Sequence, residues 1–265
     1  MLTTKLDLSQ RNPYSLTKTM SKKIYIDGDM LLYRAAFSAE KEIKWDDDIF
    51  TVHSDFSDLK DCFIMVTDCI NEILMVDEEE GDKVTMVFSD RYTFRHEINP
   101  LYKAHRREKR TPLGLGALRD WACDTWETQH EQRLEADDVL GIIGSSEPGS
   151  IIVSGDKDFA TVPCIWYNFL KDELRTVTLE EADRQHLVQT LAGDATDGYF
   201  GVPRVGLKTA EKLLDKEGVE WQTVVNAYEK AGMGEDEALL NARMAFILRE
   251  GYYDKDTKEI TLWTP

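Results

Sequence analysis

Carboxylate side chains form five short clusters along the chain, and their oxygens are the ligands that hard divalent cations prefer in proteins. Hydrolysis of a phosphodiester often uses two such ions about 4 Å apart, which hold the attacking and the leaving oxygen. Without metal, so many converging charges would repel one another. The pattern therefore predicts a two-metal site. The clusters comprise Asp27; Asp90; Glu135, Asp137 and Asp138; Asp156 and Asp158; and Asp194 and Asp197.

Each cluster alone also has an ordinary structural interpretation. A single Asp after a strand is commonly a turn or a helix cap, and the acids at 135–138 suit the first turn of a helix. The Gly-Asp-Lys-Asp sequence at 155–158 resembles part of a calcium loop, but the later Gly and Glu of an EF-hand are missing. It is the placement of all five clusters after strands or at helix starts that favours a metal site.

The elements that must position these acids alternate between strands and helices. Apolar runs predict strands at residues 23–27, 83–88 and 150–154, with shorter ones at 165–169 and 175–178. Apolar residues at helical spacing predict helices at residues 29–38, 55–76, 118–126 and 134–143, and most of the remaining C-terminal part is expected to be helical. This alternation predicts an α/β fold with a mostly parallel central sheet flanked by helices. Such sheets bind ligands beyond the carboxyl ends of their strands, where Asp27, Asp90 and Asp156 stand.

The charge of the chain is unevenly distributed. The net charge of −18 argues against a nucleic-acid partner, because phosphates repel an acidic surface. Between Arg91 and Arg110, however, seven basic residues stand against two acids, a local balance of +5. This basic segment is either a solvated surface loop or a contact surface for phosphates.

Composition limits the class of protein. The 265 residues, 42% of them hydrophobic, suffice for one large domain, and no apolar run approaches the roughly 18 residues of a membrane helix. Residues 1–22 are polar and are expected to form a flexible extension without a secretory signal. None of the four cysteines belongs to a Cys-x-x-Cys pair, which favours a reducing, cytoplasmic setting.

The ordered set of motifs resembles the metal-site motifs of the 5′-nuclease superfamily, which includes flap endonucleases, the 5′-nuclease domain of bacterial DNA polymerase I and bacteriophage 5′→3′ exonucleases. The likeness is greatest to the compact exonucleases of short-tailed phages, and it covers about residue 23 to the C-terminus. It implies a PIN/5′-nuclease-like domain at 23–265, with an arch-like basic segment at 91–119 and an embedded helix-hairpin-helix at 191–217. The motifs that resemble the metal site are residues 26–29, 88–90, 135–138, 154–158 and 193–198. Residues 201–214 resemble the helix-hairpin-helix, and residues 99–106 and 258–263 resemble segments of the phage enzymes.

The resemblance also implies roles for individual residues. The first metal site would use Asp27, Asp90, Glu135, Asp137 and Asp138, some of them through water, and the second Asp156, Asp158, Asp194 and Asp197. Two Mg²⁺ ions are expected, with Mn²⁺ able to substitute. Lys103 and Arg106 would act on the scissile phosphate. Tyr102 would stack on a base, or else be an ordinary half-buried aromatic residue. The expected DNA contacts are Arg95, Tyr102, Arg107, Lys109, Arg204, Gly206 and Lys208.

Two departures from the family pattern concern the site and the hairpin. Asp29 stands where many relatives have a neutral residue, and we expect it to be the N-cap of the next helix rather than an outer ligand. In the hairpin, Arg204 replaces a common glycine and Leu207 a common proline. Gly206 still allows backbone N–H groups at a helix N-terminus to face a phosphate, whereas Arg204 adds charge and could alter the turn.

By this resemblance the chain is expected to be a metal-dependent 5′→3′ exodeoxyribonuclease of an infected bacterial cytoplasm. It would degrade duplex DNA from the 5′ end to 5′-phosphorylated products, and also RNA in RNA–DNA hybrids. The alternatives are a flap endonuclease or RNase H-like primer remover, a catalytically silent DNA-binding module, and a calcium-binding interaction protein. The crowding of acids further predicts that Asp138→Asn stabilises the metal-free protein.

Overall fold

A six-stranded sheet forms the centre of the fold in the computed structural model, which describes residues 21–104, 106 and 109–265. In spatial order its strands are β5 (Glu127–Gln129), β4 (Lys83–Val87), β1 (Lys23–Asp27), β6 (Ile151–Val153), β7 (Ile165–Asn168) and β8 (Glu173–Thr176). All neighbours pair in parallel except β7 and β8, which are antiparallel. The predicted mostly parallel sheet is confirmed. Nearly all of the predicted extension, residues 1–20, lies outside the described residues.

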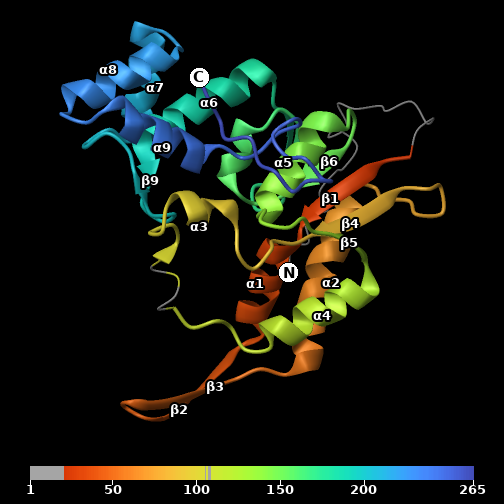
Figure 1. Cartoon of the computed structure of the whole chain (residues 1–265). Helices are drawn as coiled ribbons and strands as arrows, with labels where there is room; N and C mark the ends of the chain where they lie inside the picture. The colour runs from red at the N-terminus through yellow and green to blue at the C-terminus, as the bar shows by residue number, and fades with distance from the viewer. Residues whose placement is uncertain (1–20, 105, 107–108) are drawn as a thin grey trace, which may run out of the picture.

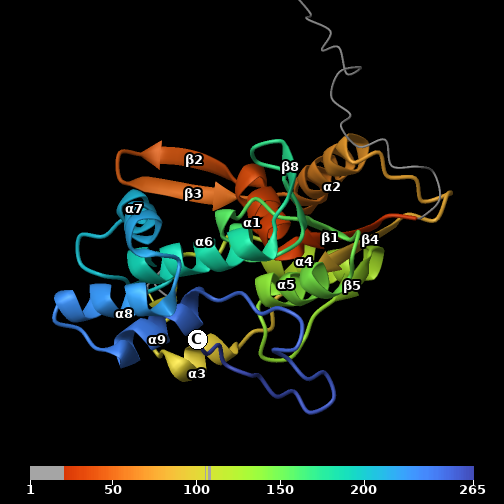
Figure 2. The same cartoon turned by 90° about the horizontal axis from the view of Figure 1, so that it is seen from above.

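Helices cover both faces of the sheet (Figures 1 and 2). On one face, α1 (Gly28–Ala39), α2 (Phe56–Ile73) and α4 (Leu115–Thr125) enclose a core with Ile24 and Ile26 of β1. On the other face, α5 (Ala136–Ser146) packs in a second core with Val87 and Ile152. Both faces of the central strands are therefore buried, which is typical of parallel sheets.

The C-terminal helices surround a third core on one side of the sheet (Figure 1). They are α6 (Leu179–Ala192), α7 (Leu207–Glu217), α8 (Trp221–Lys230) and α9 (Glu235–Ala245). A short antiparallel pair, β9 (Gly193–Asp194) and β10 (Tyr199–Phe200), joins α6 to the segment before α7. α6 also packs against the 3₁₀ helix η3 (Lys157–Thr161), which follows β6. This packing brings acids from distant parts of the sequence to one end of the sheet.

The hairpin of β2 (Lys41–Asp46) and β3 (Ile49–His53) was not predicted from the sequence. It projects from the body between α1 and α2 (Figure 1), and every residue of β2 is exposed. Ile43 and Trp45 do alternate with polar residues in β2, a short strand signal that the sequence reasoning passed over, and both side chains are exposed instead of packing in a core. Within the described ranges, no helix has the length and apolar character needed to cross a bilayer.

Candidate metal centre

A cavity of about 280 Å³ lies at the carboxyl ends of the central strands. Its wall contains six of the nine acids predicted to bind metal: Glu135, Asp137, Asp156, Asp158, Asp194 and Asp197. They come from the start of α5, the turn between β6 and η3, and the β9–β10 turn. The expected convergence of acids from distant segments at one edge of the sheet is therefore present in the fold.

Asp27 lies directly behind this wall, where β1 ends and α1 begins. Its Oδ1 accepts a hydrogen bond from Met30 N at 3.0 Å, so Asp27 is the N-cap of α1. Its Oδ2 accepts one from the Ser154 hydroxyl at 2.9 Å. Burial, with smaller contributions from the charges of Asp29 and Asp156, raises the pKa of Asp27 to about 7. Asp29 is not the N-cap that we predicted. Its Oδ2 instead accepts from Ser89 N at 2.9 Å.

The acids of the wall interact strongly with one another. Burial raises the pKa of Asp137 well above its usual range, with the charges of Asp27, Asp156 and Glu135 adding to the effect. Burial likewise raises the pKa of Asp158 to about 7, and the charge of Asp156 contributes next. Asp156 therefore lies between a first group of acids, around Asp137, and a second group, around Asp158.

Basic side chains stand among the acids and neutralise part of their charge. Lys103 Nζ lies 2.8 Å from Glu135 Oε1 and 3.9 Å from Asp197 Oδ2. Arg106 pairs with Asp197 Oδ1 at 2.8 Å, and Lys157 Nζ lies 3.7 Å from Asp194 Oδ2. Lys103 and Arg106 therefore adjoin the acidic cluster, and their action on the scissile phosphate stays a prediction.

The donor set suits a hard divalent cation, although the acids do not enclose one as they stand. In the described part of the chain, no three or more Asp, Glu, His or Cys side chains are arranged to hold an ion. The described wall nevertheless offers carboxylate oxygens without thiols or imidazoles. Gln189, which does not line the cavity but donates to Asp158 of the wall, has a buried Oε1 without a hydrogen-bond partner among the described residues. Binding would require the carboxylates to turn from the basic side chains toward the ion.

Glu135 is held in its ionised form by its surroundings. Burial opposes ionisation, but Lys103 and Arg95 lower the pKa of Glu135 to about 2. The Tyr102 hydroxyl donates to Glu135 Oε2 at 2.6 Å, and the Tyr102 side chain is buried. The expected base stacking by Tyr102 is therefore corrected, because its ring packs inside the protein, edge-on to His96.

Asp138 and Arg95 form a buried ion pair instead of the predicted metal ligand and DNA contact. The Arg95 guanidinium donates to Asp138 Oδ2 at 2.5 Å and to Oδ1 at 2.8 Å. Asp138 Oδ1 also accepts from Leu248 N, and Oδ2 from Glu135 N. Asp138 is 0% and Arg95 3% exposed. Both oxygens of Asp138 are occupied and Arg95 cannot reach a DNA backbone, so these two predictions are corrected.

Asp90 is not brought to the cavity wall. Its Oδ1 accepts from Arg91 N at 2.7 Å and its Oδ2 from Arg133 N at 2.8 Å, which fixes the loop before α5. α3 (Phe94–Ile98) and the basic segment follow it. Of the other basic residues predicted to contact DNA there, Lys109 is exposed, whereas Arg107 lies outside the described residues.

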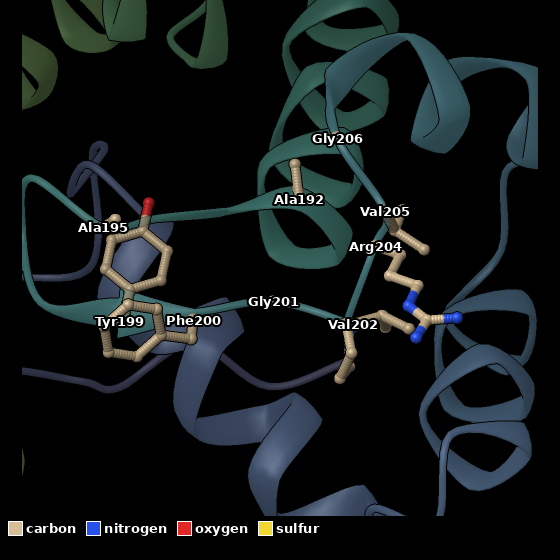
Figure 3. Close-up of a pocket in the computed structure, with 10 residues that line it drawn as sticks. Ala192, Ala195, Tyr199, Phe200, Gly201, Val202, Arg204, Val205 and Gly206 are labelled. Atoms are coloured by element: carbon tan, nitrogen blue, oxygen red, sulfur yellow. The ribbon is translucent and has the colours of Figure 1, made fainter.

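The predicted helix-hairpin-helix includes a second cavity, of about 420 Å³, in front of α7 (Figure 3). Arg204 adopts the left-handed backbone conformation with φ of 67°, so the turn forms although a common glycine is missing. Gly206 is the N-cap of α7 and provides no side-chain cap for it. Arg204 and Lys208 are exposed beside it. Thr209 N–H bonds Gly206 O at 2.9 Å, whereas among the described residues the N–H groups of Leu207 and Lys208 have no hydrogen-bond acceptor and can face an anion.

Two side chains that hold the acids in place were missed by the sequence reasoning. The Ser154 hydroxyl donates to Asp27, and Gln189 Nε2 donates to Asp158 Oδ1 at 2.7 Å. Ser154 precedes the Gly-Asp-Lys-Asp motif, and this position is a signal that could have identified it. Gln189 shares α6 with Gln185, and nothing in the sequence distinguishes the two.

We expect the stability of the metal-free protein to depend on pH through Asp158. Its pKa rises from 3.8 to about 7 on folding. At a pH between these two values, the folded protein therefore keeps a proton on Asp158 that the unfolded protein has released. Stability from this group therefore falls as the pH rises from 4 to 7. Relative to wild type, Asp158→Asn should gain on the order of 1–3 kcal/mol between pH 5 and pH 8, measured by urea unfolding in EDTA.

The buried His186 acts in the opposite direction, because its pKa falls to about 4, but it is common to both proteins and cancels in the difference. Asp120→Asn, at an exposed helical position, is the matched control and should show no such gain. A pH-independent difference between Asp158→Asn and wild type would contradict the raised pKa.

Comparisons with known proteins agree with this geometry. The model of the family "5'-3' exonuclease, N-terminal resolvase-like domain" matches residues 22–187. An exodeoxyribonuclease of Enterobacteria phage T3 is 31% identical, with 98% of each chain covered. An exonuclease of Escherichia phage T7 is 30% identical, with 98% of this chain and 99% of the relative covered.

Solved structures show the same fold. The phage T5 5′-exonuclease with bound zinc superposes with a TM-score of 0.61 at 16% identity, over 84% of this chain and 89% of that one. The catalytic core of Rad2 in complex with DNA gives a TM-score of 0.52 at 11% identity, over 80% of this chain and 65% of that one.

Proposed function

The chain belongs to the 5′→3′ exonuclease family, and on this premise we propose that it hydrolyses duplex DNA from the 5′ end with two divalent metal ions. The products would carry a 5′-phosphate and leave a 3′-hydroxyl. The observation that carries the proposal is the convergence of six acids from three segments in one cavity wall, which also contains Lys103. The likeness to phage enzymes favours the cytoplasm of an infected bacterium as the place of action.

We assign the acids to two ion sites by their positions around the cavity. Asp27, Glu135, Asp137 and Asp156 would hold one ion, and Asp158, Asp194 and Asp197 the other, with Asp156 between them. The chemistry that divalent ions supply in such a site is activation of water and stabilisation of the attacking and leaving oxygens. Mg²⁺ suits the all-oxygen donor set, and Mn²⁺ is expected to substitute for it.

Lys103 and Arg106 would act on the scissile phosphate. When Glu135 and Asp197 turn to an ion, the two basic side chains lose their present partners and face the cavity. Lys103 has a left-handed backbone with φ of 51°, held by a hydrogen bond from its N–H to Asp197 O at 3.0 Å. Such strain is maintained where the surroundings fix it, and it would place Lys103 Nζ before the substrate arrives.

The duplex beyond the cleaved bond would contact the helix-hairpin-helix. The N–H groups of Leu207 and Lys208, together with the exposed side chains of Arg204 and Lys208, would form a site for backbone phosphates. Lys109, and by family resemblance Arg107, would add phosphate contacts near the cavity. These contacts would attract DNA despite the net charge of −18.

The substrate is tested with end-labelled duplex, 5′-flap and RNA–DNA hybrid molecules in Mg²⁺, read for product size. We expect short 5′-labelled products from the duplex first, with slower release from the hybrid. Release of the intact flap without duplex degradation would instead favour a flap endonuclease. Binding without any cleavage would contradict the proposed function and favour a silent DNA-binding module.

Lys103→Ala should lower the single-turnover cleavage rate by about 10²–10³-fold at saturating Mg²⁺, because a cation aimed at the reacting phosphate acts mainly in the transition state. DNA affinity should change little. Rapid-quench kinetics with excess enzyme, together with binding titrations in Ca²⁺, separate the two quantities.

Lys109→Ala is the matched control, since Lys109 is exposed and away from the acidic wall. It should weaken binding and reduce the slope of log affinity against log salt by about 0.9, as the loss of one phosphate contact does. If Lys103→Ala behaved like Lys109→Ala and kept the full rate once bound, Lys103 would be a tether and not a catalytic residue.

A further inference from the structure

Gln189, on the face of α6 that packs against η3, is a buried polar residue that the mechanism above does not use. The residue is 6% exposed, and its Nε2 donates to Asp158 Oδ1 at 2.7 Å. Its Oε1 is fully buried and has no hydrogen-bond partner in the part of the chain that the structure describes. The amide must face Asp158 with its nitrogen, because a carbonyl oxygen placed there would repel the carboxylate. The free atom is therefore the carbonyl oxygen.

The other buried polar side chains of this helix are satisfied within the protein. The Thr190 hydroxyl donates to His186 O at 2.9 Å, and His186 Nε2 lies 2.8 Å from Ala242 O. Gln189 differs because one end of its amide holds an acid of the cavity while the other end has no partner. Buried polar atoms are normally paired, so an unpaired acceptor beside a cation site suggests a partner that arrives with the cation.

We propose that Gln189 is a positioning residue for the second ion site, an inference that rests on the proposed function. Nε2 fixes the orientation of Asp158 toward the cavity, and Oε1 accepts a hydrogen bond from the hydration shell of the incoming ion. Mg²⁺ keeps several waters when it binds to proteins, so it brings such donors with it. Groups that orient metal ligands in this way commonly change metal affinity by about 10–100-fold when they are removed.

Two substitutions at this position should act in opposite directions. Gln189→Met keeps the length of the side chain and removes both polar atoms, so it should weaken Mg²⁺ binding by about 10-fold or more. Gln189→Glu loses the donor to Asp158 and adds a negative charge. It should lower the melting temperature of the metal-free protein and enlarge the rise that Mg²⁺ produces. A purely structural role would lower the melting temperature of Gln189→Met without changing its Mg²⁺ affinity.

The experiment is calorimetric titration with Mg²⁺ and thermal melting with and without Mg²⁺, in the absence of DNA, on the full chain. Gln185→Met, at a half-exposed glutamine of the same helix, is the matched control and should behave as wild type. The expected result is a reduced Mg²⁺-induced shift for Gln189→Met and an enlarged one for Gln189→Glu. If Gln189→Met fails to fold, Gln189→Asn takes its place: it keeps a neutral amide but withdraws it from Asp158, and it should weaken Mg²⁺ binding, whereas wild-type Mg²⁺ affinity would overturn the inference.

Wild-type Mg²⁺ affinity and melting shifts in both Gln189 variants would overturn this inference alone, provided that wild type cleaves DNA with Mg²⁺. A slower cleavage by Gln189→Met at every Mg²⁺ concentration, with unchanged Mg²⁺ affinity, would also overturn it. Absence of any Mg²⁺-dependent cleavage or Mg²⁺ binding in wild type would instead remove the proposed function, and the inference with it.

Discussion

Asp156→Asn is expected to lower the cleavage rate by about three orders of magnitude or more, while DNA binding survives. Asp156 lies between the two groups of acids, because its charge raises the pKa of Asp27, Asp137 and Asp158 alike. Neutralising it removes a ligand available to both ions. It removes no exposed basic residue, so contacts with backbone phosphates remain.

The measurement is single-turnover cleavage of a 5′-labelled duplex at saturating Mg²⁺, with binding measured in parallel. Asp137→Asn should show a similar loss, since Asp137 lies in the same wall. Asp120→Asn, at an exposed position on α4, should keep the wild-type rate. Near wild-type turnover in Asp156→Asn would make the two-ion assignment wrong.

Asp138→Asn is expected to destabilise the protein by about 3–5 kcal/mol, because it leaves the buried Arg95 without its bidentate partner. This reverses the expectation drawn from the sequence, where neutralising one of many acids seemed to relieve repulsion. The reason is that Arg95 is buried, with its guanidinium also donating to Met244 O and Phe246 O. Its burial makes the expected change in the free energy of unfolding a loss of stability. Urea unfolding of the metal-free protein measures the effect.

Glu97→Gln provides the comparison for this prediction, since Glu97 pairs bidentately with Arg133 at the surface, where both side chains are about 40% exposed. An exposed pair typically contributes about 0–1 kcal/mol. If Asp138→Asn cost no more than Glu97→Gln, the buried ion pair would not stabilise the fold in the way we describe.

The sheet and the convergence of the acids were predictable because both follow from simple geometry. Parallel strands end at one edge of a sheet. Asp27 is the last residue of β1 and Asp156 follows the neighbouring strand β6, so the two acids had to approach each other. Asp137 and Asp138 were harder to tell apart. Neighbouring helical positions point about 100° apart, and only the packing of α5 determines which one faces the cavity.

The basic segment misled the sequence reasoning for a related reason. A run of basic residues suggests an exposed surface, but Arg95 and Lys103 are drawn inward by Asp138 and Glu135, acids that follow far along the chain. Burial of Tyr102 follows from the same contacts, since its hydroxyl also bonds Glu135. These pairings depend on tertiary contacts, which periodicity and composition do not encode.

The central claim is that the acidic cavity holds the divalent ions on which cleavage depends. An anomalous difference map at the manganese absorption edge, from crystals grown with Mn²⁺, tests this most directly. We expect two peaks in the cavity, one beside Asp137 and Asp156 and one beside Asp158 and Asp194. In crystals of Asp156→Asn, both peaks should be lost or much reduced. No peak in the cavity, or manganese bound only elsewhere on the protein, would contradict the account.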